Sequence, residues 1–149
     1  MPRELSPGTS MNTGTASSGW GVVLVAVGGS VGTLCRHLLD RLSHTFMPDL
    51  PVGTFLANIS GAFLLGLLVE SLSRRGTDHG RRRDLRLLLG TGLLGGYTTY
   101  SALANDTADM LLSGQGVAEA VVHASVTVVS GVLSCWAGVL LARTRGERR

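Results

Sequence analysis

The chain has 149 residues, enough for one compact unit. All 13 basic residues are arginine, 10 residues are acidic and the formal net charge is +3, with the charges clustered between long apolar stretches. The sequence contains no pairing of a nucleophile with a base, no metal-ligand spacing, no phosphate loop and no C-x-x-C pair. We therefore expect neither an enzyme nor a zinc protein.

Four apolar segments follow a polar start. Residues 1–19 are rich in Ser, Thr and Gly and are predicted to be a disordered tail, and residues 143–149 are a basic tail. The four segments are about 20–39, 52–72, 85–112 and 117–142. Each is close to or longer than the ~20 residues that cross a bilayer. They are apolar nearly all round, whereas helices of a soluble bundle have a polar face. Residues 20–142 are thus predicted to be an all-α membrane domain of four transmembrane helices.

Polar side chains inside the first two segments are candidates for function, because such groups are costly within a bilayer. Arg36, near the end of the first segment, either extends toward the lipid headgroups or faces a pore vestibule. Asn58, near the start of the second segment, offers two hydrogen-bond donors and one acceptor. The neighbouring Ser60 and Gly61 suit contact between helices.

The third segment contains GLLGGYTTYS, residues 92–101, which is unusually rich in glycine and hydroxyl groups for a membrane helix. Gly95 and Gly96 permit a break at its centre. Non-helical backbone at membrane depth is tolerated where it is buried in protein or lines a wet cavity, so freed carbonyls and the hydroxyls of Thr98 and Thr99 would point inward. The alternative is a glycine-rich packing face.

The fourth segment carries His123, Thr127 and Gly131 at intervals of four residues. This spacing places all three on one face of a helix. The face is either a functional polar stripe through the bilayer or a face without a functional role, since Thr hydroxyls often bond only to a carbonyl of their own helix.

Arginine placement predicts the orientation of the chain in the membrane. With four spans, the N-terminal tail, the second connection and the C-terminal tail lie on one side and hold eleven arginines. The other side holds Arg36 and Arg41. Excess arginine stays cytoplasmic, so both termini are predicted to be cytoplasmic in a multi-pass protein of the cell membrane. Topology accounts for these arginines, and we expect no nucleic-acid partner.

Three motifs, taken in order, resemble the CrcB/Fluc family of fluoride channels over about residues 28–142. The first is GGSVGTLCRH, a glycine-rich start that ends in an arginine. The second is GTFLANISGAFLLG, with Gly-Thr, then Asn, then small residues. The third is GLLGGYTTYSALAND, which is similar to glycines followed by Thr-Thr-Phe-Ser and a second Phe.

The resemblance implies an antiparallel dimer with two narrow pores and four helices in each subunit, the third broken at its centre. Such a channel exports fluoride passively and lowers its cytoplasmic concentration. Backbone carbonyls at the break hold a structural sodium ion at the dimer centre, and by position these belong to Gly95 and Thr98. Asn58 would donate a hydrogen bond to the anion. The remaining residues implied for the anion path are Thr99, Tyr100, Ser101, Leu103, His123, Thr127 and Arg36.

Two positions depart from the family pattern. Its first phenylalanine is Tyr100, which keeps an aromatic ring, and its second is Leu103, which has no ring edge to offer an anion. The family acid and the fourth-span tyrosine correspond to Asp106 and His123. We therefore expect any pore that relies on Leu103 of this subunit to lack full ring coordination.

The arginine bias favours a heterodimer. An antiparallel homodimer needs one chain inserted both ways, which requires a nearly balanced arginine distribution. We expect a second four-span subunit of opposite orientation, with a homodimer as the alternative. Two other functions stay open: a small proton-coupled exporter, for which Asp106 is the candidate carboxylate, and a non-conducting assembly subunit, which the loss of the ring at Leu103 would suit.

Overall fold

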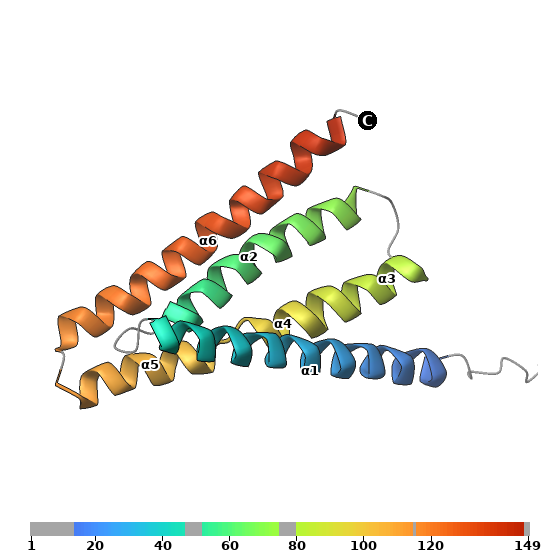
Figure 1. The fold of residues 1–149 in the computed structure, drawn as a ribbon. Coiled ribbons are helices and arrows are strands. Elements are labelled where there is room, and N and C mark those ends of the chain that lie inside the picture. Colours follow the sequence, from blue (N-terminus) through green and yellow to red (C-terminus); the bar gives the residue numbers. More distant parts are fainter. Residues whose placement is uncertain (1–13, 47–51, 75–79, 115, 148–149) are drawn as a thin grey trace, which may run out of the picture.

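The computed structural model describes residues 14–46, 52–74, 80–114 and 116–147, and this part of the chain is all-helical (Figure 1). Residues 1–13 of the predicted N-terminal tail lie outside it. The elements are α1 (Gly14–Phe46), α2 (Val52–Ser73), α3 (Arg81–Leu85), η1 (Arg86–Leu94), α4 (Gly95–Tyr97), α5 (Tyr100–Leu112) and α6 (Val117–Glu147). Within these described ranges, three stretches are long and apolar enough to cross a membrane: Gly19–Phe46, Val52–Ser73 and Val117–Arg145.

Helices α1 and α6 are longer than the apolar segments that predicted them. Helix α1 begins at Gly14 rather than near residue 20, and it ends at Phe46 rather than near residue 39. No glycine or proline interrupts the chain between Leu39 and Phe46, and the hydroxyls of Ser43 and Thr45 bond back to the helix. The length of an apolar segment reflects the thickness of the bilayer. The helix itself ends only where the sequence gives a stop signal such as glycine or proline, which can lie beyond the apolar segment.

The helices pack through small residues and turn their large apolar residues outward. The buried residues of α2 are Gly53, Thr54, Ala57, Gly61 and Gly66. In contrast, many large apolar side chains are exposed along the helices, Trp136 and Val132 among them. A protein folded in water buries its large apolar residues and exposes polar ones. This reversed pattern is the one expected of helices that are surrounded by lipid or by a partner subunit.

Helices α2 and α6 lie side by side in Figure 1 and approach closely through glycine. A Cβ added to Gly66 would collide with the carbonyl of Cys135, and one added to Gly138 would collide with the carbonyl of Phe63. At this crossing each helix therefore contacts the backbone of the other through a glycine, where no side chain intervenes.

Arginines gather at the end of the bundle where α1 and α3 begin and α2 and α6 end (Figure 1). At this end Trp20 Nε1 donates to Asp84 Oδ2 at 3.4 Å. Glu70 accepts from Arg74 Nε at 2.7 Å and from Arg143 Nε at 3.2 Å, which joins α2 to α6. The described arginines of this end are Arg74, Arg81, Arg82, Arg83, Arg86, Arg143 and Arg145.

The contact between η1 and α1 generates a packing prediction. A Cβ at Gly92 would lie 2.9 Å from the Val25 carbonyl oxygen and 3.0 Å from Gly28 Cα, so Gly92→Ala must push two backbones apart. We expect a loss of roughly 1–3 kcal/mol in the free energy of unfolding, measured by thermal or denaturant unfolding of the purified protein in detergent.

Gly90→Ala is the matched control within η1. Its added Cβ would be 3.6 Å or more from its neighbours, all flexible side-chain atoms. Equal stability of the two variants would contradict the close packing of η1 on α1.

Candidate site at Thr98 and Thr99

Two extended residues separate α4 from α5. Thr98 has φ −82° and ψ 151°, and Thr99 has φ −153° and ψ 130°. Helical hydrogen bonding cannot pass through such residues, because it requires ψ near −40°. The polar groups of this short stretch of backbone must therefore find other partners.

Asn58 on α2 pairs with both backbone groups of Thr99. Its Oδ1 accepts from the Thr99 N–H at 2.9 Å, and its Nδ2 donates to the Thr99 carbonyl at 3.2 Å. One side-chain amide thus satisfies polar groups of two successive peptide units. The amide keeps one further N–H, because a primary amide carries two donors.

Helix α1 contacts the break from another direction. The hydroxyl of Thr33 and the Nε of Arg36 each donate to the Gly96 carbonyl at 3.4 Å. Arg36 is partly buried at this position. Its guanidinium is therefore directed toward the backbone at the break.

The Thr99 side chain begins the next helix. Its hydroxyl accepts from the Ala102 N–H at 3.3 Å, so Thr99 is the N-cap of α5. It also forms a 2.8 Å hydrogen bond with the hydroxyl of Ser101.

A cavity of about 580 Å³ brings seven of the ten predicted site residues together. None of the described residues that line it is acidic. The seven are Asn58, Gly95, Thr98, Thr99, Tyr100, Leu103 and Thr127. Ser101 reaches the group through its hydrogen bond to Thr99, whereas Arg36 and His123 do not line this cavity.

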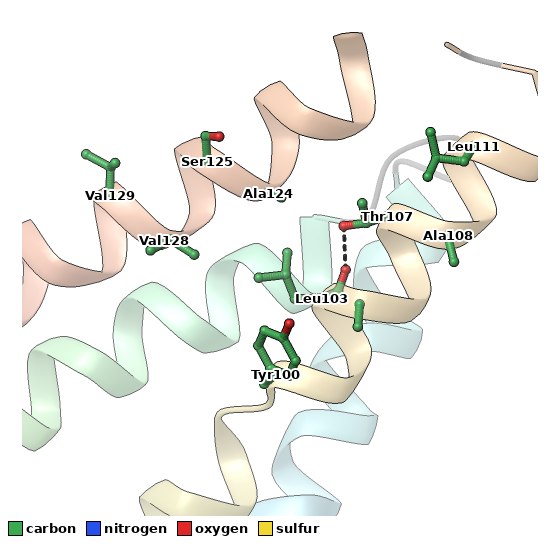
Figure 2. A pocket seen from close by; sticks show the side chains of 10 residues that line it. Tyr100, Leu103, Thr107, Ala108, Leu111, Ala124, Ser125, Val128 and Val129 are labelled. Carbon is green, nitrogen blue, oxygen red and sulfur yellow. Dashed lines mark hydrogen bonds between the residues drawn. The ribbon is translucent and has the colours of Figure 1, made fainter. Parts of the chain in front are cut away.

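Tyr100 and Leu103 lie in different environments, although both belong to α5. Figure 2 shows them beside a second groove, of about 670 Å³, between α5 and α6. Tyr100 is 82% exposed and Leu103 only 6%. The ring of Tyr100 is thus available at the surface of the single chain, whereas Leu103 is part of the packing.

His123 and Thr127 lie one turn apart on α6. The Thr127 hydroxyl donates to the His123 carbonyl at 2.9 Å. Thr127 is almost completely buried and is one of the residues that line the cavity. Asp106 lies near Thr54 and His123. Among the described residues, His123 Nε2 and Asp106 Oδ2 are the buried side-chain atoms without a hydrogen-bond partner.

Thr33 and Thr54 were not predicted from the sequence as part of the site. Both were detectable by helical spacing. Thr33 precedes Arg36 by three residues and Thr54 precedes Asn58 by four, so each shares a helix face with a predicted residue.

The contact between Asn58 and Thr99 generates a stability prediction. Asn58→Leu has a similar volume but removes the acceptor of the Thr99 N–H, whereas the Thr99 carbonyl, as that of an N-cap residue, still accepts within α5. Losing the partner of a buried backbone group costs about 1–3 kcal/mol. We expect a clear fall in the midpoint of thermal unfolding. Asn105→Leu, at an exposed position of α5, is the control. Equal midpoints for the two variants would show that Asn58 does not hold the break.

Comparison with known proteins places the chain in a family. The model of the CrcB-like protein family, Camphor Resistance, matches residues 23–139. Fluoride-specific ion channel FluC 2 of Leifsonia xyli subsp. xyli is 47% identical over 131 residues, which are 88% of this chain and 89% of the relative. FluC 1 of Cutibacterium acnes is 40% identical over 83% of this chain and 85% of its own length. FluC of Caulobacter sp. strain K31 is 36% identical over 82% and 94%. The chain belongs to the CrcB family.

Proposed function

We propose that this protein is a subunit of a fluoride channel that lets the anion leave the cell passively. Its relatives at up to 47% identity are named fluoride-specific ion channels. The observation that carries the proposal is the cavity beside Thr98 and Thr99, which gathers amide and hydroxyl groups without an acidic residue among its described lining. An anion that sheds its hydration water needs hydrogen-bond donors in its place, and a carboxylate would repel it.

Asn58 is the proposed central donor of the anion path. One of its two N–H bonds is used on the Thr99 carbonyl, so the other is free to point at a passing ion. The hydroxyls of Thr99, Ser101 and Tyr100 would continue the path, with Thr127 beside them. These groups are neutral, and they can therefore release the ion as readily as they accept it. Leu103 adds no donor to this path, and His123 and Arg36, which do not line the cavity, would act from outside it.

A structural sodium ion at the break is the second part of the proposal. We assign its ligands to the carbonyls of Gly95 and Thr98. Their chemistry fits, because unwound backbone carbonyls are common sodium ligands in membrane proteins. The extended backbone at Thr98 and Thr99 supports the assignment, since neither carbonyl can keep a helical partner across it.

For the assembled channel we propose an antiparallel heterodimer in the cell membrane. The segment from α3 to α5 would form one span interrupted at Thr98 and Thr99, and both termini would be cytoplasmic. The gathering of arginines at one end of the bundle favours a single orientation for this chain. The relatives named FluC 2 and FluC 1 are consistent with paired subunits.

Expression in fluoride-sensitive cells tests the heterodimer. We expect no growth on fluoride with this chain alone, and growth when a four-span relative with reversed arginine bias is expressed with it. Full rescue by this chain alone would rule out an obligate heterodimer. A complex that forms but never supports fluoride efflux would instead identify a non-conducting assembly subunit.

Asn58→Asp tests the anion path. A negative charge about 4 Å from a passing anion costs roughly 4 kcal/mol at the dielectric constant of a protein site, so fluoride flux from liposomes should fall roughly a hundredfold or more. Asn105→Asp, exposed on α5, adds the same charge away from the cavity and serves as the control. Normal flux through the Asn58→Asp complex would remove Asn58 from the path.

A proton-coupled exporter is the second candidate, because Asp106 has a buried carboxylate oxygen without a partner among the described residues. The same liposomes distinguish the two. A channel moves fluoride down its own gradient with no imposed pH gradient, whereas an exporter moves fluoride uphill when a proton gradient is imposed. Uphill transport would overturn the channel.

A further inference from the structure

We propose that the side chains of Asn58 and Thr99 create the sodium site by taking the two backbone N–H groups that a continuous helix would direct at the Gly95 and Thr98 carbonyls. This inference rests on the proposed sodium site and assigns positioning roles to two residues so far considered only for the anion.

The first ligand is freed by Asn58. In a continuous helix the Thr99 N–H would donate to the Gly95 carbonyl, four residues earlier. Here the Thr99 N–H donates to Asn58 Oδ1 at 2.9 Å, across 41 residues of sequence. The Asn58 Nδ2, bonded to the Thr99 carbonyl at 3.2 Å, holds the next peptide group, on the other side of the Thr99 Cα.

The second ligand is freed by Thr99. The helical donor for the Thr98 carbonyl would be the Ala102 N–H. That N–H instead donates to the Thr99 hydroxyl at 3.3 Å, as the N-cap of α5. One side chain on α2 and one at the break therefore each remove a competitor for a carbonyl oxygen.

Neighbouring carbonyls are occupied, which makes the choice of ligands specific. The Leu94 carbonyl accepts from both the N–H and the hydroxyl of Thr98, each at 2.9 Å. The Gly96 carbonyl accepts from two side chains of α1, and the Thr99 carbonyl accepts from Asn58. The hydrogen bonds around the break thus leave the Gly95 and Thr98 oxygens for a cation.

Sodium-dependent stability is the readout, because it does not require fluoride flux. The purified channel complex in detergent is heated in sodium chloride or in N-methyl-D-glucamine chloride of equal ionic strength, and the unfolding midpoint is followed as sodium is titrated. The wild-type midpoint should rise with sodium. In Thr99→Val the Ala102 N–H is released toward the Thr98 carbonyl, and in Asn58→Leu the Thr99 N–H is released toward the Gly95 carbonyl. Each variant should need at least about tenfold more sodium for the same effect.

Two controls separate positioning from general damage. Thr99→Ser keeps the hydroxyl and should keep the sodium response. Thr107→Val makes the same hydroxyl deletion within α5, where the hydroxyl bonds only to its own helix at the Leu103 carbonyl, and should also keep it. If Thr99→Val does not fold, Asn58→Asp and Asn58→Leu test the same point from α2. Asp retains an acceptor for the Thr99 N–H and should respond to sodium although its fluoride flux is lost.

The outcomes distinguish this inference from the proposed function. An unchanged sodium response in both Thr99→Val and Asn58→Leu overturns the positioning roles and leaves the sodium site standing. No sodium response in the wild type overturns the site and these roles together, while the fluoride proposal is decided separately by the flux assay.

Discussion

Every backbone N–H and carbonyl at membrane depth needs a partner, because lipid supplies none. Along most of this chain the helices meet that need by themselves. Thr98 and Thr99 are extended between α4 and α5, and the neighbouring helices supply the missing partners. Asn58 reaches Thr99 from α2, while Thr33 and Arg36 reach the Gly96 carbonyl from α1. The break is therefore a property of three helices together.

Short side chains such as those of Asn58 and Thr33 reach the break only because the helices approach closely. Gly28 and Gly32 on α1 face the backbone of η1 and α4 with no room for a Cβ, and Gly61 on α2 leaves space for the Thr98 methyl group. The small residues that draw the helices together also leave the large apolar ones on the outside. The placement of small residues between the helices thus accounts both for the close packing at the site and for the apolar exterior.

The apolar segments predicted the long helices well, because lipid demands a continuous run of apolar residues. They predicted the ends of α1 poorly, since the backbone continues as a helix into the polar boundary. Asn58 was identifiable as an isolated amide within an apolar run. Its partner was not, because the contact with Thr99 spans 41 residues and depends on how α2 packs against α5. The spacing of Thr33 from Arg36 placed the two on one helix face, but its contact with the Gly96 carbonyl, 63 residues away, depends on how α1 packs against α4.

The two extended residues also place the C-terminal end of one helix next to the N-terminal end of another. The run from α3 through α4 finishes at Tyr97 with its carbonyl end, which carries partial negative charge, and α5 starts at Tyr100 with its amide end, which carries partial positive charge. The Gly95 and Thr98 carbonyls lie at the negative end, and Ser101 lies at the positive end. These two residues therefore present one helix end whose partial charge suits a cation and another whose partial charge suits an anion. No formally charged group is among the described residues that line the cavity.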